Sequence, residues 1–175
     1  MVRAMSGQPL FHPPVPAHAA TWEGIDWEPL VDAALRCRER AYAPYSSFRV
    51  GAALLTADGR IYEGCNVENR ILGLTLCAER GALSAAVADG RTSFRALAIA
   101  TTATPPCAPC GQCRDALAEF TRDLPVVSVT AGDQEAAKWR RFTLRDLLPE
   151  PFDLPQPGPR PRSRGSERER PRRQR

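Results

Sequence analysis

Two short cysteine segments, at residues 77–80 (CAER) and 109–114 (PCGQCR), limit most strongly what this chain can fold into. A Cys-x-x-Cys spacing lets two thiolates reach one zinc ion from a single turn of chain. Both segments lie where helices are expected to begin. The unpaired N–H groups and the dipole of a helix N-terminus favour a thiolate over a thiol. The fold must therefore bring two helix N-termini that are distant in sequence to the same place.

The predicted zinc ligands are Cys77, Cys110 and Cys113. Three thiolates leave the fourth tetrahedral position of zinc open for water, which is the arrangement of a catalytic zinc, whereas a structural zinc is closed by a fourth protein ligand. Cys107 is the candidate for such a fourth ligand, but a closed site would leave Glu79 without a purpose. We therefore predict a catalytic site with one Zn²⁺ per subunit.

Glu79 is the predicted proton carrier of this site. The only two histidines, His12 and His18, lie near the N-terminus, so a carboxylate must perform the acid–base chemistry. Glu79 follows a ligand by two residues and can face a metal-bound water without binding the metal. Zinc makes water a usable nucleophile near neutral pH. Arg80 and Arg114 can hydrogen-bond the ligand sulfurs and offset the charge that three thiolates donate.

The composition fits a globular protein of a reducing compartment. With 175 residues, 43% of them hydrophobic, the chain can form one domain with a buried core. No run approaches about 18 consecutive apolar residues, so no membrane span is expected, and the N-terminus lacks the apolar segment of a secretory signal. We therefore expect a cytoplasmic location, where six cysteines suggest metal binding or catalysis before disulfides.

The positive charge is concentrated at the C-terminus. Residues 156–175 contain eight arginines and two glutamates, a net charge of +6. Because the whole chain has a net charge of +4, the remaining 155 residues carry −2. A slightly acidic body lacks the electrostatic footprint of a nucleic-acid-binding protein. We interpret the basic segment as a solvated, disordered tail.

The order of patterns along the chain predicts its organisation. We expect a disordered leader at 1–20, a catalytic domain at 21–154 and an Arg/Pro-rich tail at 155–175. The domain should contain helices at 27–42 (capped by Asp26, stopped by Pro44), 76–89, 110–121 and 143–148, and strands at 48–55, 60–67, 95–101, 125–130 and 138–142. This alternation, with one hairpin at Asp58-Gly59, predicts an α/β fold. We expect a three-layer α/β/α sandwich with a mixed five-stranded sheet.

Further motifs accompany the cysteine segments in a fixed order: 43–46 (APYS), 48–54 (FRVGAAL), 64–69 (GCNVEN) and 147–152 (LLPEPF). A glutamate beside the first cysteine, followed by P-C-x-x-C, is also the signature of the zinc-dependent nucleobase deaminases. With these motifs the chain resembles the small, homotetrameric cytidine deaminases over about residues 27–154.

The resemblance implies roles for five further residues. Phe48 would stack on the pyrimidine ring, Asn66 and Glu68 would hydrogen-bond the ribose hydroxyls, and the backbone N–H of Ala78 would hold the base edge beside Glu79. Phe152 would come from a neighbouring subunit and close the pocket, so a homotetramer would share its active sites. The implied reaction is hydrolytic deamination of cytidine and deoxycytidine by a zinc-bound hydroxide, in pyrimidine salvage.

Three positions depart from the family pattern: Arg70 and Leu72, in the segment 69–75, and Asp115. They leave open the alternative of a deaminase for a modified cytosine nucleoside or a nucleoside antibiotic. A nucleic-acid editor or binding module, supported by the basic tail alone, and a purely structural zinc module are further alternatives. Taken as isolated residues, Cys37 and Cys65 are small core hydrophobes and Trp22, Trp27 and Trp139 are packing residues.

Overall fold

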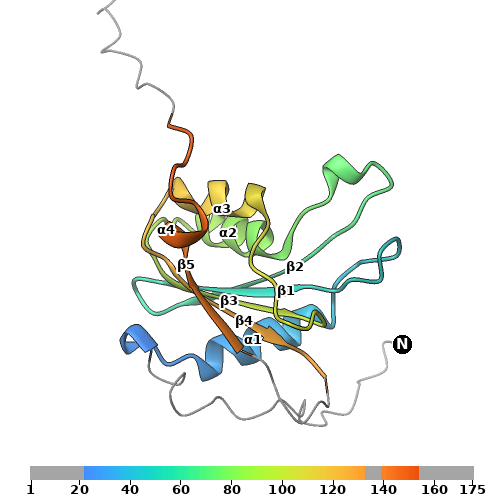
Figure 1. The fold of residues 1–175 in the computed structure, drawn as a ribbon, viewed down its shortest axis with the longest axis horizontal. Helices are drawn as coiled ribbons and strands as arrows, with labels where there is room; N and C mark the ends of the chain where they lie inside the picture. Colours follow the sequence, from blue (N-terminus) through green and yellow to red (C-terminus); the bar gives the residue numbers. More distant parts are fainter. Residues whose placement is uncertain (1–21, 133–138, 154–175) are drawn as a thin grey trace, which may run out of the picture.

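A mixed five-stranded sheet forms the middle layer of the computed structural model, which describes residues 22–132 and 139–153 (Figure 1). The strands are β1 (Gly51–Thr56), β2 (Ile61–Cys65), β3 (Phe94–Thr101), β4 (Pro125–Thr130) and β5 (Trp139–Thr143). Their order is β2-β1-β3-β4-β5, and β3 and β4 form the parallel pair, while the other neighbours are antiparallel. The predicted leader and the predicted tail both lie outside the described residues.

Helices cover both faces of this sheet. Helix α1 (Glu28–Arg38) packs on one face, and α2 (Ala78–Ala88), α3 (Gly111–Ala118) and α4 (Leu144–Leu147) lie on the other (Figure 1). Short 3-10 turns at Trp22–Gly24 and Leu72–Leu74 complete the described elements. The predicted three-layer α/β/α sandwich is therefore confirmed. Within the described ranges, no helix has the length and apolar character needed to cross a membrane.

The first helix is shorter than predicted. Helix α1 ends at Arg38 instead of residue 42, so Pro44 does not stop it. The backbone of Tyr42 is instead drawn toward the chain that follows β2: its N–H donates to the Asn66 carbonyl at 3.0 Å, and its carbonyl accepts from the Glu68 N–H at 2.8 Å. This pairing pulls the chain into an extended conformation and ends the helix early.

The start of α1 is anchored by tryptophans. Trp27, not Asp26, occupies the N-cap position, although the Asp26 carboxylate still accepts a hydrogen bond from the Glu28 N–H at 3.3 Å. Trp27 is completely buried, and its ring stacks on Trp22 with the centroids 5.6 Å apart. Trp139 packs against the same cluster from β5. The prediction that these three tryptophans are packing residues is confirmed.

Two glycines allow the helices to approach the sheet closely. A Cβ atom on Gly51 of β1 would lie 2.0 Å from the Ala34 carbonyl oxygen of α1. A Cβ atom on Gly64 of β2 would lie 2.2 Å from the Ala78 carbonyl oxygen and 2.3 Å from the Ala82 nitrogen of α2. Because successive strand residues point to opposite faces, these glycines let α1 and α2 contact strand backbone from opposite sides.

Candidate active site

The three predicted zinc ligands come together at two helix N-termini. Cys77 immediately precedes α2, Cys110 immediately precedes α3, and Cys113 lies in the first turn of α3. The Cys77 and Cys110 sulfurs are 3.7 Å apart, and the Cys110 and Cys113 sulfurs are 3.4 Å apart. The N-terminus of a helix has unpaired N–H groups and a positive dipole end, and both favour negative charge on thiols placed there.

The geometry of the thiol cluster fits a zinc ion. All three sulfur atoms lie within 4.8 Å of one another. Tetrahedral zinc with Zn–S bonds of about 2.3 Å places its sulfur ligands about 3.8 Å apart. Cys107 is not part of this cluster, since its sulfur lies 3.8 Å from the Thr101 hydroxyl. The three-cysteine site therefore fits the ligand set of a zinc ion with one open position.

Hydrogen bonds within and beside the cluster favour ionisation of one of its sulfurs. A hydrogen bond from the Cys113 thiol, followed by one from Arg80, lowers the pKa of Cys77 to about 5. The same hydrogen bond, with burial, raises the pKa of Cys113. Cys77 is therefore the thiolate of the pair, and zinc binding must displace the proton of Cys113.

The two predicted supporting arginines act in different ways. One Arg80 Nη atom donates to the Thr75 carbonyl at 2.8 Å and lies 3.8 Å from the Cys77 sulfur, as expected of a donor to a ligand. Arg114 instead donates to backbone, to the Pro109 carbonyl at 2.7 Å and the Leu147 carbonyl at 2.9 Å. The expected contact of Arg114 with a sulfur is thus replaced by a brace that joins the metal loop to α4.

Glu79 lies in the first turn of α2 with only 5% of its surface exposed. Burial is the largest influence on its carboxyl group and raises the pKa of Glu79, while hydrogen bonds from its own N–H and from Cys113 oppose the shift. A buried carboxyl group with a raised pKa can both accept and return a proton near neutral pH. It is placed beside the thiols without being one of the clustered ligands.

A cavity of about 300 Å³ opens beside the thiols, a size that suits a small ligand. It is lined by Phe48, Val50, Asn66, Thr75, Cys77, Ala78, Glu79, Ile99, Thr101, Cys107, Ala108 and Cys110. The cavity thus combines predicted ligands, the predicted proton carrier and three of the five predicted substrate contacts. The polar side chains lie among apolar ones, which is typical of a pocket that orients a small molecule.

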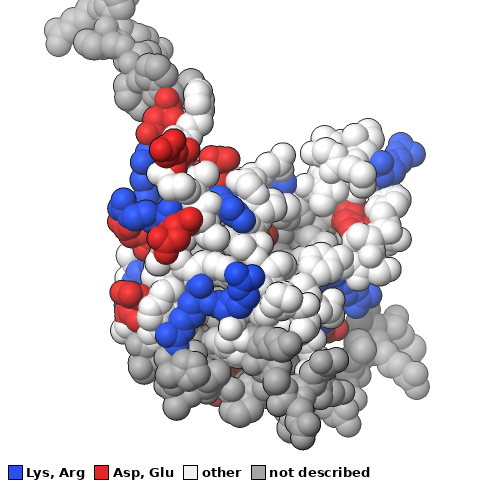
Figure 2. All heavy atoms as spheres, in the orientation of Figure 1, with Lys and Arg blue, Asp and Glu red and all other residues white. Residues whose placement is uncertain are grey.

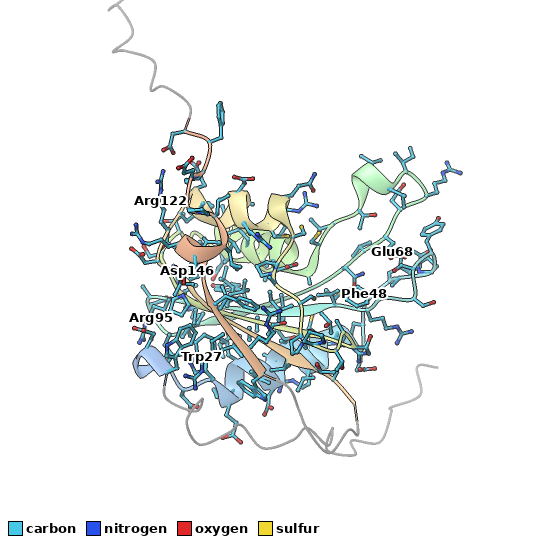
Figure 3. All side chains as sticks on the ribbon, in the orientation of Figure 1. Trp27, Phe48, Glu68, Arg95, Arg122 and Asp146 are labelled. Atoms are coloured by element: carbon cyan, nitrogen blue, oxygen red, sulfur yellow. The ribbon has the colours of Figure 1, made fainter. Side chains whose placement is uncertain are left out.

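Asn66 holds one wall of the cavity. Its amide oxygen accepts from the Val50 N–H at 2.8 Å, and its amide nitrogen donates to the Phe48 carbonyl at 2.9 Å. These bonds hold the segment that enters β1, which explains why β1 begins at Gly51 and not at the predicted residue 48. Phe48, which Figure 3 labels, lines the cavity and stays 38% exposed.

Glu68 lies next to this wall but does not line the cavity. Its carboxylate accepts hydrogen bonds from the Tyr45 N–H at 2.8 Å, the Ser46 N–H at 3.2 Å and the Ser46 hydroxyl. The Ser46 hydroxyl is the largest cause of the lowered pKa of Glu68. Glu68 therefore fixes the turn before Phe48, on the side of the molecule where Figure 3 labels both residues.

Phe152 lies apart from the cavity. Its ring is 80% exposed, and it borders a second hollow together with Asp115 and Arg122. The single subunit therefore does not bring Phe152 to its own thiol cluster. The same hollow contains Asp115, one of the three departures from the family pattern, away from the candidate active site.

Some lining residues were missed by sequence reasoning. Ile99 and Thr101, at the end of β3, and Thr75, before α2, give no local chemical signal because they belong to ordinary strand and loop patterns. Cys107 was considered only as a metal ligand, although it lines the cavity. The alternation of β3 could have identified Ile99 and Thr101, since both point to the face that carries α2.

The zinc-dependent deaminases combine three thiolate ligands with a nearby carboxylate that carries protons and does not bind the metal. The fold and the site assign the protein to this class. More specifically, the sequence pattern of the cytidine and deoxycytidylate deaminase zinc-binding region matches residues 26–129, and the chain belongs to this family. The three-cysteine cluster could hold the zinc ion of this family.

Similar proteins agree with this assignment. A cytidine deaminase of Sporosarcina psychrophila is 46% identical over 130 residues, which cover 73% of this chain and 92% of that protein. The crystal structure of cytidine deaminase from Burkholderia pseudomallei has a TM-score of 0.65 at 46% identity and covers 71% of this chain and 97% of that one. The structure of cytidine deaminase from Mycobacterium tuberculosis has a TM-score of 0.62 at 39% identity, over 74% of this chain and 99% of that one.

Proposed function

We propose that this protein hydrolyses the exocyclic amine of cytidine and deoxycytidine to give uridine and deoxyuridine. The observation that carries the proposal is the Glu79 carboxyl group, buried in the cavity beside three thiols that fit zinc. Deamination by water needs a nucleophilic oxygen and a proton carrier that reaches the ring nitrogen and the leaving amine. A single carboxyl group on the first turn of α2 can serve all of these transfers.

Each residue around the cavity has a separate role in the proposed reaction. Zinc, when bound at the thiols, makes water a usable nucleophile near neutral pH. Glu79 takes one proton from the attacking water and transfers it to N3 of the pyrimidine, and then takes the second from the new C4 hydroxyl, which becomes the carbonyl, and gives it to the leaving amine. Arg80 donates toward the Cys77 sulfur and so adds to the larger effect of the Cys113 hydrogen bond in favouring ionised Cys77. The apolar wall around Ile99 and Val50 limits the entry of bulk water.

The same cavity suggests how a nucleoside is held. Phe48 offers a partly exposed ring for stacking on the base, and the Ala78 N–H lies at the N-terminus of α2, where it can donate to the base edge. Asn66 has one N–H and one oxygen lone pair left after its hydrogen bonds to the Val50 and Phe48 backbone, and these can reach a ribose hydroxyl. The Glu68 carboxylate can accept a further hydrogen bond, from a sugar hydroxyl, with the oxygen lone pairs that Tyr45 and Ser46 leave free.

We also propose a homotetramer with shared active sites. Ile71, Leu72 and Leu74 are 59%, 74% and 65% exposed in the segment that leads to α2, and Phe152 is 80% exposed. Exposed apolar side chains in such number mark a surface that is covered by a partner. In this assembly, Phe152 would close the cavity of a neighbouring subunit. Light scattering should give the mass of four chains, and Phe152→Ala should raise KM for cytidine more than it lowers kcat.

The cellular role we propose is pyrimidine salvage in the cytoplasm. The product and substrate are free nucleosides, and the cavity of about 300 Å³ leaves little room for a polymer. On the face shown in Figure 2, basic side chains are interspersed with acidic ones, a distribution that gives no continuous basic track for nucleic acid. Growth on cytidine as the pyrimidine source, restored by this chain in a deaminase-deficient host, tests the role.

An ammonia-release assay tests the activity itself. Cytidine and deoxycytidine should be turned over, free cytosine should be a poor substrate because it lacks the ribose, and a chelator should abolish turnover until zinc is restored. If only modified cytosine nucleosides are used, the proposed substrate class is wrong. The double variant Arg70→Ala, Leu72→Tyr then decides whether these two departures set that preference.

A further inference from the structure

Two cysteines outside the zinc site lie opposite each other across a helix–strand contact. Cys65, the last residue of β2, pairs with Gly51 of β1 in the antiparallel ladder. Directly opposed residues of such a ladder point to the same face of the sheet. The direction of Gly51 therefore gives the direction of the Cys65 side chain.

Gly51 points toward the last turn of α1. A Cβ atom at this position would lie 2.0 Å from the Ala34 carbonyl oxygen, 2.5 Å from the Arg38 nitrogen and 2.8 Å from the Arg38 Cβ. Cys65 thus faces the same helix turn, which contains Cys37. The missing side chain at Gly51 is what allows α1 to come so close to this strand pair.

The next residue on the same face of β2 agrees with this register. Glu63, two positions before Cys65, pairs with Arg36 at 3.3 Å and with Arg40 at 3.4 Å, so the α1 end lies over this side of β2. Gly64, between them, faces α2 instead. The alternation Glu63, Gly64, Cys65 leaves Cys65 on the α1 side.

The two thiols differ in access. Cys37 is 5% exposed, while Cys65 is partly exposed. Burial, followed by the Cys65 thiol and the Glu63 carboxylate, raises the pKa of Cys37 to about 11. The Cys65 thiol is thus an immediate neighbour of Cys37. A disulfide needs the two Cα atoms to lie close together, about 4.4–6.8 Å apart, and the missing side chain at Gly51 lets the α1 backbone approach the β1–β2 pair closely.

We propose that Cys37 and Cys65 form a redox-active dithiol, which a small-molecule disulfide of the glutathione type oxidises to a disulfide between α1 and β2. The Cys65 thiolate attacks the small disulfide, forms a mixed disulfide and releases one thiol. Cys37 loses its proton and attacks the Cys65 sulfur, which closes the protein disulfide and releases the second thiol. The protein gives up two electrons and two protons, and the small disulfide takes up both.

The cross-link would act on the wall of the cavity and not on the zinc thiols. Cys65 directly precedes Asn66, whose side chain holds the Phe48 and Val50 backbone. The zinc ligands lie on the other side of the sheet, at the N-termini of α2 and α3. Oxidation should therefore fix the entry of β1 against α1, raise the melting temperature and leave zinc bound.

Peptide mapping of the zinc-loaded, full-length protein tests the proposal. The protein is incubated with excess oxidised glutathione, quenched by alkylation and digested without reductant. Wild type should yield a peptide pair linked through Cys37 and Cys65, with unchanged zinc content and a melting temperature higher by about 5–10 °C. Cys37→Ala should instead retain one glutathione on Cys65, because the second thiol is missing, and Cys65→Ala should give neither product.

The outcomes separate a dithiol from two independent thiols. If wild type accumulates the same stable glutathione adduct on Cys65 as Cys37→Ala, the two thiols do not react with each other and the proposal is wrong. Two unmodified thiols in the wild type would also overturn it. The mapping of wild type decides the question even if a variant fails to fold. None of these readouts depends on deaminase activity, so the proposed function is tested separately.

Discussion

Cys77 and Cys37 are both helix-associated thiols, but they lie at opposite ends of helices on opposite faces of the sheet. Cys77 precedes α2, and a hydrogen bond from Cys113 lowers its pKa to about 5. Cys37 lies one residue before the end of α1, where burial raises its pKa to about 11. The helix N-terminus stabilises a thiolate, and the C-terminus does the reverse. Hydrogen bonding within the thiol cluster and burial under α1 thus separate a metal ligand from a thiol that stays protonated, and the helix ends act in the same direction.

The largest effect is expected from removing the proton carrier beside Cys77, the ionised thiol. Glu79→Gln should lower kcat about 10²–10⁴-fold, because the amide cannot carry a proton, and zinc content should be unchanged. The matched control is Glu63→Gln, a carboxylate on the α1 face that pairs with Arg36 and Arg40. Its kcat should stay near wild type. Activity of Glu79→Gln above about a tenth of wild type contradicts the assignment.

Replacing one cysteine by alanine in the zinc site and one in the Cys37–Cys65 pair should affect zinc content and stability differently. Cys110→Ala removes a ligand, so zinc content should fall well below one per chain and the free energy of unfolding should drop with it. Cys37→Ala should keep zinc and cost about 1 kcal/mol, as a small change in a packed core. Zinc content by atomic emission and unfolding in denaturant measure both. Full occupancy and activity in Cys110→Ala would instead implicate Cys107 as a ligand.

Thiol reactivity should follow the two pKa values when zinc is removed. At pH 7, Cys77 is ionised, whereas about one Cys37 thiol in 10⁴ is. Lower nucleophilicity of the low-pKa thiolate offsets part of this difference, so alkylation of Cys77 should be about 10- to 40-fold faster. The Cys77 rate should be flat above about pH 6, and the Cys37 rate should rise about tenfold per pH unit toward pH 11. Similar rates for both contradict the comparison; circular dichroism checks that the fold persists.

The smallest effect concerns Arg80, which donates toward the Cys77 sulfur and to the Thr75 carbonyl. Arg80→Ala should weaken zinc affinity about tenfold, as expected for a partner of a metal ligand. Arg36→Ala, which loses an exposed ion pair on the other face, is the control and should leave zinc affinity unchanged. Competition with a chromogenic chelator measures both. Equal affinities in the two variants would show that Arg80 does not support the thiolate.

The sequence was sufficient for the parts of the site that depend on local spacing. Cys110 and Cys113 belong to one turn of chain, and Cys77 and Glu79 to another, so their relation to the helix ends could be predicted from the motifs. The alternation of strand and helix patterns likewise predicted the three layers and all five strands. In these cases, the physical cause lies within a few residues of the feature.

Features that depend on distant partners were not predictable in the same way. The end of α1 is set by the pairing of Tyr42 with Asn66 and Glu68, and the residues of the helix itself do not indicate where it ends. Arg114 reaches Leu147 of α4 instead of a sulfur, because the fold brings that carbonyl within 2.9 Å. Phe152 lies 80% exposed and away from the cavity of its own chain, and the proposed contact with a neighbouring subunit would depend on an assembly that local sequence patterns do not specify.

The close contact of Gly64 with α2 makes a residue without functional groups hard to replace. Even the methyl group of alanine would meet the Ala78 carbonyl and the Ala82 nitrogen at 2.2 and 2.3 Å, and the obstacle is helix backbone, not a movable side chain. The first turn of α2 would have to shift, and with it Glu79. In a survey of substitutions scored by turnover, Gly64 would therefore rank among the residues that perform the chemistry. Intolerance at this position would report the spacing between β2 and the catalytic helix.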